Sequence, residues 1–194
     1  MPNSHLYFPH LKLAQSYWKK FLKKGDVAID ATVGRGHDSN FLAPLLLGKD
    51  LGELFCIDIQ EKAITTSKNL LDKELRKELF KNITFILDSH EDFKKNIDIK
   101  VNLIVYNLGY LPRGDKTVTT KVKSTLLSLE SAFKILADKG AISIMCYPGH
   151  TEGQKEEIAI LDYLRNIDNK KFNICYHKWI NKEKAPSLIW IEKK

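Results

Sequence analysis

Short apolar runs alternate with longer amphipathic stretches along most of this chain. Five of the runs have the length and composition of buried strands, and they span 27–30, 54–57, 83–87, 101–106 and 141–147. Apolar residues spaced three or four positions apart predict helices, at about 11–24, 38–47, 61–80, 119–138 and 154–167. Two further β-rich runs, at 172–179 and 187–191, are joined by a polar turn and should pair antiparallel.

The alternation of strands and helices predicts an α/β protein with a Rossmann-like architecture. We expect a seven-stranded, mostly parallel sheet that ends in an antiparallel C-terminal hairpin and carries helices on both faces. A chain of 194 residues suits one domain with a sizeable core, and no linker, internal repeat or low-complexity segment interrupts it. We therefore predict a single domain over residues 1–194, with the helix at 11–24 as an appendage.

Composition indicates the class of protein, its cellular location and the state of its cysteines. Apolar residues make up 43% and charged residues 28% of the chain, which are ordinary values for a globular protein. No apolar run approaches membrane-spanning length and the N-terminus lacks the apolar segment of a signal peptide, so we expect a cytoplasmic location without membrane contact. Cys56, Cys146 and Cys175 fall in strand-like runs without metal-ligand spacing, which predicts buried, reduced thiols and no metal site.

The most informative motif is DATVGRGHDS, where the first strand ends at Asp30 and a glycine-spaced turn leads into a helix at Asp38. Gly34 and Gly36 permit a tight turn and let a ligand approach bare backbone. The third glycine of the dinucleotide pattern is replaced by His37 and Asp38, which disfavours a nicotinamide cofactor. A carboxylate at Asp30 could instead face the cationic methionine portion of S-adenosylmethionine (SAM). The alternative is a purely structural left-handed turn.

Polar residues also gather where the other predicted strands end. Asp58 ends the second run, where a ribose-binding acid is expected; alternatively, it caps the helix that follows. The next three runs end in turn-forming segments at 88–90, 107–112 and 148–150. Because ligands bind beyond the carboxyl ends of parallel strands, these loops should converge on one crevice.

Four motifs make the chain resemble a known family, and they are DATVGRGHDS, IDIQ, NLGYLPRGDK and YPGH. The family consists of small bacterial Rossmann-like methyltransferases long described as ribosomal RNA methylases, and the resemblance covers almost the whole chain. It implies the class I methyltransferase fold, SAM as the cofactor, and methylation of the aminomethyl group on the wobble uridine or 2-thiouridine of transfer RNA (tRNA). Arg35 and Arg113 depart from the Asn and Gly that the family commonly carries, which could alter contacts to cofactor or RNA.

The motifs and strand ends nominate a set of cofactor-binding residues: Asp30, Thr32, Gly34, Gly36, His37, Asp38, Asp58, Gln60, Asp88, Ser89, His90 and Asn107. Methyl transfer to nitrogen needs mainly a neutral nucleophile held at short distance and correct angle, and such positioning is worth about 7 kcal/mol or more. Asn107, Tyr110 and His150 are the expected catalytic residues, with the asparagine accepting from the amine and the tyrosine ring stacking on the base. The alternatives are a turn or cap role for each histidine and a core position for Tyr110.

The formal net charge of +7 is compatible with an RNA partner, because Lys and Arg gain affinity by displacing counterions from phosphate. Tyr110, Arg113 and Lys116 are expected to contact the anticodon stem-loop of tRNA. The lysines between 19 and 24 are interpreted instead as the solvated face of an amphipathic helix. The sequence leaves open whether the protein forms a homodimer. Other functions left open are SAM-dependent methylation of ribosomal RNA or a small molecule, a dinucleotide-dependent oxidoreductase, and a non-catalytic RNA-binding module.

Overall fold

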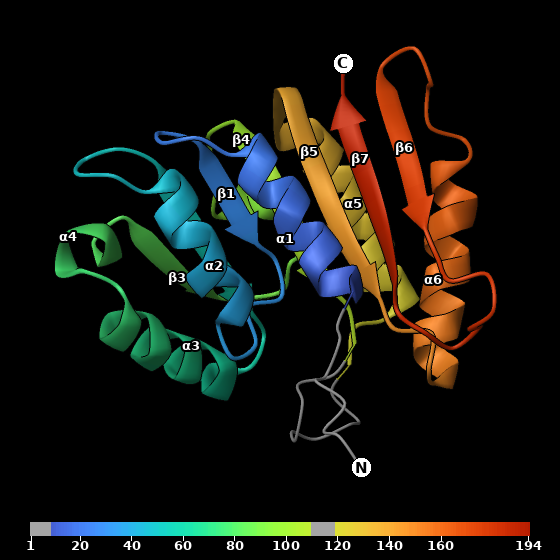
Figure 1. Ribbon diagram of the computed structural model, residues 1–194, viewed down its shortest axis with the longest axis horizontal. Helices are drawn as coiled ribbons and strands as arrows, with labels where there is room; N and C mark the ends of the chain where they lie inside the picture. The colour runs from blue at the N-terminus through green and yellow to red at the C-terminus, as the bar shows by residue number, and fades with distance from the viewer. Residues whose placement is uncertain (1–8, 110–118) are drawn as a thin grey trace.

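The computed structural model describes residues 9–109 and 119–194, in which one seven-stranded sheet carries helices on both faces (Figure 1). The strands are β1 (Val27–Asp30), β2 (Glu53–Asp58), β3 (Ile83–Leu87), β4 (Val101–Asn107), β5 (Leu136–Cys146), β6 (Phe172–His177) and β7 (Ser187–Lys193). The helices are α1 (Pro9–Phe21), α2 (His37–Leu46), α3 (Glu61–Glu74), α4 (Lys77–Phe80), α5 (Val122–Ile135) and α6 (Thr151–Leu164), with a short 3-10 helix, η1, at Phe93–Lys95.

The strand order is β3-β2-β1-β4-β5-β7-β6. β1 pairs in parallel with both β2 and β4, and the β2–β3 and β4–β5 pairs are parallel as well. β7 runs antiparallel between β5 and β6. The predicted fold, a mostly parallel sheet with an antiparallel C-terminal hairpin, is therefore confirmed. Because the strand order reverses direction between β1 and β4, their carboxyl ends flank the place where ligands bind in such sheets.

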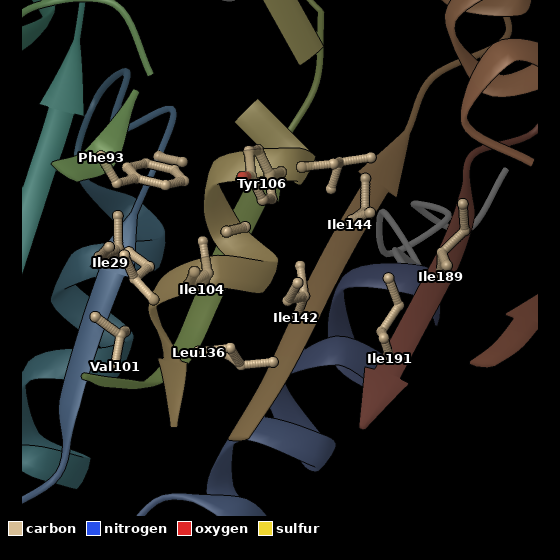
Figure 2. Close-up of a cluster of buried hydrophobic side chains, with 14 of the residues drawn as sticks. Ile29, Phe93, Val101, Ile104, Tyr106, Leu136, Ile142, Ile144, Ile189 and Ile191 are labelled. Atoms are coloured by element: carbon tan, nitrogen blue, oxygen red, sulfur yellow. The ribbon is translucent and has the colours of Figure 1, made fainter. Parts of the chain in front are cut away.

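One face of the sheet packs against α5, α6 and η1 through a cluster of buried aliphatic and aromatic residues. Ile29, Ile104, Ile142 and Ile191 are consecutive partners across β1, β4, β5 and β7, so they form one row on this face (Figure 2). All four are fully buried. Burial of each side chain stabilises the fold by about 2 kcal/mol, which explains why the apolar strand runs are so strongly patterned.

The opposite face packs against α1, α2 and α3 through the residues that alternate with this row, such as Ala28 and Leu103. Trp18 of α1 is 2% exposed, and Ala14 and Leu22 are buried on the same side. α1 therefore belongs to the packed layer over β5 and β7, whereas the sequence pattern suggested an appendage.

Three of the differences between the observed and the predicted helix boundaries have a clear local cause. The predicted helix 61–80 is divided, because the backbone becomes extended at Leu75 (φ −99°, ψ 151°) and α4 then returns the chain to β3. α5 stops at Ile135, since Leu136 already pairs with β4 as the first residue of β5. α6 starts at Thr151 because His150 supplies an N-cap.

Cys175 lies exposed on β6, the edge strand of the sheet, so the expectation of a buried thiol is wrong at this position. Cys56 and Cys146 are buried in central strands, as expected. An edge strand leaves more of its side chains in contact with water than a central strand does, which apolar composition alone does not reveal. Within the described ranges, no helix has both the length and the apolar character needed to cross a bilayer.

Candidate functional site

A cavity of about 900 Å³ opens at the carboxyl edge of the parallel strands. Its lining comes from the segments that follow β1, β2, β3, β4 and β5, so the predicted convergence of the strand ends is confirmed. Ten of the residues nominated from the sequence line it, and they are Thr32, Gly34, His37, Asp38, Asp58, Gln60, Ser89, His90, Asn107 and His150. Asp30, Gly36 and Asp88 do not line the cavity. Tyr110, Arg113 and Lys116 lie outside the described residues.

The loop between β1 and α2 turns tightly at two glycines. Gly34 and Gly36 have φ angles of 51° and 82°, left-handed values that favour glycine. The N–H of Gly36 donates to the carbonyl of Val33 at 2.7 Å, which closes the turn. A Cβ on Gly36 would lie 2.8 Å from Cδ1 of Leu71 in α3. Gly34 therefore presents backbone to the cavity, whereas Gly36 lets α2 pack on α3, a different role from the ligand approach expected there.

Asp30 lies beneath this loop, contrary to the expectation that it faces a cationic ligand. Its side chain is buried; Oδ2 accepts from Oγ of Ser39 at 2.6 Å, and Oδ1 accepts from the N–H of Thr32 at 3.3 Å. Burial and, secondly, the nearby Asp38 carboxylate raise the pKa of Asp30 to about 7. The carboxylate that this loop presents to the cavity is that of Asp38, in the first turn of α2.

Asp58, at the end of β2, braces the glycine loop. Its Oδ2 accepts from the N–H of Gly34 at 3.0 Å, and its Oδ1 accepts from the N–H of Gln60 at 2.9 Å. Burial raises the pKa of Asp58, and these backbone hydrogen bonds act in the opposite direction. A carboxylate has about four acceptor sites, so beside these bonds and a backbone hydrogen bond from Ile59 it can still accept from a ribose hydroxyl. The alternative N-cap role does not apply, because the N-cap of α3 is Gln60.

His90, after β3, lines the cavity although it is only 9% exposed. Its Nδ1 lies 3.2 Å from the carbonyl oxygen of Ala31, so the ring hydrogen is on Nδ1 and Nε2 is an acceptor. Burial lowers the pKa of His90 and favours the neutral ring. Nε2 has no hydrogen-bond partner among the described residues, a costly state that a ligand donor would relieve. Asp88 instead binds Lys95 at 2.5 Å and Asn96 at 3.1 Å.

Asn107 ends β4, the strand between β1 and β5. Its backbone N–H donates to Oγ1 of Thr32 at 2.8 Å, and its Nδ2 donates to Oδ2 of Asp38 at 3.1 Å. With Nδ2 engaged, Oδ1 is the acceptor that this side chain can offer to a ligand. Tyr147 directly follows β5; burial raises the pKa of its hydroxyl to about 12, and the neighbouring side chain of Asn107 acts in the opposite direction. Asn107, Asp38 and Tyr147 therefore form one polar cluster in the cavity.

His150 caps α6 through its ring. Nδ1 accepts from the N–H of Gly153 at 3.1 Å. A neutral imidazole that accepts at Nδ1 carries its hydrogen on Nε2, so it has no lone pair left to take a proton. The capping alternative therefore fits His150 better than a general-base role. His37, the first residue of α2, lines the cavity from an exposed position.

A buried acid on α6, Glu156, links the chain just before residues 110–118 to the chain just after them. Glu156 is 2% exposed, and its carboxylate accepts from the hydroxyls of Thr120 at 2.8 Å and Thr125 at 2.5 Å. Oγ1 of Thr120 accepts in turn from the N–H of Gly109 at 2.9 Å. The N–H of Thr120 donates to the carbonyl of Gly109 at 3.2 Å, so these two residues are fixed next to each other beside the cavity.

Several basic residues line the cavity that no motif singled out. Lys121 and Lys123 lie at the start of α5, and Lys184 lies between β6 and β7; all three are exposed. Lysines occur throughout this chain, so only the fold shows which ones reach this edge. Tyr147 could have been found from its place at the end of the fifth strand run, in the YPGH motif. Within residues 9–109 and 119–194, no group of three or more His, Cys, Asp or Glu residues is placed to hold a metal ion.

Known proteins share this architecture. Residues 54–193 match the family described as "Putative rRNA methylase". A "putative rRNA-methylase" from Clostridium thermocellum is 36% identical, with 95% of this chain and 97% of that chain covered and a TM-score of 0.90. A "putative methyltransferase" from Streptococcus mutans in complex with S-adenosylhomocysteine (SAH) is 28% identical, with 95% and 98% covered and a TM-score of 0.82.

A curated relative has a named RNA substrate. The chloroplastic tRNA (mnm(5)s(2)U34)-methyltransferase of Arabidopsis thaliana is 28% identical over 188 residues, which cover 94% of this chain and 69% of the relative. The family match spans most of the chain and runs from within β2 to the end of β7. The chain therefore belongs to the "Putative rRNA methylase" family of Rossmann-like methyltransferases.

Proposed function

We propose that the protein is a SAM-dependent methyltransferase that acts in the cytoplasm on the aminomethyl group of the wobble uridine or 2-thiouridine in the anticodon stem-loop of tRNA. Family membership and the SAH-bound relative support the reaction class and the cofactor. The name of the Arabidopsis relative and the lysines that line the cavity support this acceptor. Ribosomal RNA is a second candidate acceptor, which the family description favours.

The residues present fit SAM, which supplies a methyl group on a positively charged sulfonium. Asp58 can accept from a ribose hydroxyl without giving up its bonds to the backbone. The neutral His90 ring offers its unpartnered Nε2 to a donor such as an exocyclic amine. Asp38 presents a carboxylate that can face the positive charge of the cofactor.

The observation that carries the proposal is the placement of Asn107 between Thr32 and Asp38. Two hydrogen bonds hold the asparagine, so its Oδ1 can accept from the acceptor amine and orient the nitrogen lone pair. The amine must react in its neutral form, and removal from water lowers the pKa of an amine. Asp38 lies beside the same point, where it can stabilise the positive charge that the nitrogen gains on methylation.

The test is a single-turnover assay on tRNA that carries the free aminomethyl nucleoside, at saturating SAM, with products identified by mass spectrometry. We expect Asn107→Ala to lower the rate about 100-fold, because the amine loses its alignment, with SAM affinity close to wild type. Asn69→Ala, at an exposed position of α3, is the matched control and should react at the wild-type rate.

Two results would contradict the proposal. A wild-type rate in Asn107→Ala would remove this side chain from the mechanism. If the wild-type enzyme methylates ribosomal RNA but not the tRNA under the same conditions, ribosomal RNA is the acceptor and the proposed tRNA substrate is wrong.

A further inference from the structure

The segment 178–186, here called the hairpin segment, joins β6 to β7. β7 runs antiparallel to both β5 and β6, so β6 points in the same direction as β5 and the other parallel strands (Figure 1). The carboxyl end of β6 therefore lies at the edge of the sheet that carries the cavity. Lys184 lines the cavity, and its carbonyl oxygen lies 3.7 Å from the position that a Cβ on Gly149 would take.

A buried acid holds both ends of the hairpin segment. Glu157 of α6 is 4% exposed; its Oε1 accepts from Oγ of Ser187, and its Oε2 lies 3.5 Å from Nζ of Lys178. Within the segment, the N–H of Ala185 donates to the carbonyl of Lys182 at 3.1 Å. The two ends are therefore tied to α6 and the turn is closed by its own hydrogen bond, so the segment has a defined place at this edge of the sheet.

The hairpin segment carries an exposed aromatic ring with a lysine beside it. Trp179 is 38% exposed, and Nζ of Lys182 lies 4.9 Å from the centre of its ring. Lys182 and Lys184 are both exposed, and two further lysines at the start of α5 line the same cavity. Proteins that bind single-stranded RNA combine these same features, because aromatic rings stack on bases while lysines contact phosphates.

We propose that the hairpin segment binds the RNA acceptor beside the reacting nucleotide. Trp179 stacks on an unpaired base that neighbours the modified one, and Lys182 and Lys184 contact the adjoining phosphates. The proposal rests on RNA being the substrate, as in the proposed function. A loop of RNA suits this surface better than a duplex does, since only unpaired bases can present a face to the indole ring.

The experiment measures binding of a fluorescently labelled anticodon stem-loop by anisotropy at several KCl concentrations, with full-length protein. We expect Trp179→Ala to weaken binding about tenfold and Trp179→Phe to restore most of the affinity. Replacing Lys182 and Lys184 together by alanine should lower the slope of log Kd against log salt by about one to two. The matched control replaces Lys170 and Lys171, which precede β6 at the opposite edge of the sheet, and should change neither quantity.

Calorimetry with SAM and thermal melting accompany each variant, and both should match the wild type. Wild-type RNA affinity in Trp179→Ala would overturn the proposal, as would a change in salt slope equal to that of the control pair. Light scattering tests the other use of an exposed indole: if Trp179→Ala halves the molar mass without weakening RNA binding, the surface joins two copies of the chain. If the wild type binds the stem-loop but does not methylate it, the proposed function fails. If the wild type methylates the stem-loop and the hairpin-segment variants bind it as tightly as the wild type, only this inference is rejected.

Discussion

Two neighbouring acids determine the charge of the site at the scale of single residues. Asp30 is buried under the glycine loop, Asp38 lines the cavity, and burial raises the pKa of both. Asn107 donates a hydrogen bond to Asp38, which favours the ionised form of that carboxyl. Of the two acids, Asp38 is the one whose carboxylate lines the cavity.

Asp30→Asn should change how stability depends on pH. The pKa of Asp30 is about 7 in the folded protein against an ordinary value of 3.8, so the folded state keeps a proton that the unfolded chain releases. This contribution to stability is complete below the ordinary pKa and is lost as pH rises through about 7, at about 1.4 kcal/mol per pH unit between the two values. Wild-type stability should fall over this window relative to Asp30→Asn.

Urea unfolding of both proteins from about pH 4 to about pH 8 measures the difference. Asp72→Asn, at an exposed position of α3, serves as the control and should follow the wild type. A difference between wild type and Asp30→Asn that stays constant with pH would mean that the folded pKa of Asp30 is not raised.

At the scale of elements, the contact between α2 and α3 depends on the absence of a side chain at Gly36. Gly36→Ala places a methyl group 2.8 Å from Leu71 and imposes a φ of 82° on alanine. Gly25 has a φ of 95° with nothing within 4 Å of its ideal Cβ, so Gly25→Ala isolates the backbone strain. We expect losses of about 1 kcal/mol at Gly25 and about 2–4 kcal/mol at Gly36.

Equilibrium unfolding of the two variants checks this expectation. In a double-mutant cycle, Gly36→Ala should cost less in a Leu71→Ala background than in the wild type, because the contact with Cδ1 of Leu71 is gone while the contact with Ser67 remains. Equal destabilisation by the two substitutions would show that backbone strain alone accounts for the need for glycine at position 36. Contact with α3 would then play no part.

Element identity could be predicted from the sequence more completely than element boundaries. Short apolar runs identified the strands because burial on both faces demands them, but the break at Leu75 has no glycine or proline to mark it. The apolar helical spacing runs on to Leu136, and Asp138, Lys139 and Gly140 interrupt the strand pattern, so the sequence assigns the first residues of β5 to a helix. Pairing with β4, a distant contact, decides that boundary.

Prediction of the site was limited in a similar way. Strand-end residues such as Asp58 and Asn107 could be nominated because the fold alone brings strand ends together. Glu156, Glu157 and Lys184 act through partners far away in sequence, so no local pattern distinguishes them from ordinary helix or turn residues. Asp30 shows the converse, because a motif position does not tell whether its side chain turns toward the ligand or beneath the loop.

For the molecule as a whole, α1 completes the second face of the sheet. Trp18→Ala should destabilise the entire protein by about 3–5 kcal/mol, because a large buried ring would leave a cavity. Trp18→Phe should cost less, since it keeps a ring and removes an Nε1–H that lacks a partner among the described residues. Both variants should unfold in one transition, as expected for a single domain.

Circular dichroism and tryptophan fluorescence, recorded during the same thermal unfolding, test this prediction. If the main transition of Trp18→Ala keeps the wild-type midpoint while a small early transition appears, α1 melts alone and is an appendage after all.

The cavity draws its two sides from different stretches of the chain, and this division affects how the family can diversify. Asp58 and His90 belong to the first half of the sequence, whereas Glu156 and the hairpin segment belong to the last third. If the hairpin segment binds the acceptor as proposed, exchange of the later segments between relatives would change the acceptor and leave the residues proposed to bind SAM in place. Asn107 would stay with the first side, because its bonds to Thr32 and Asp38 hold it to the glycine loop and not to the later segments.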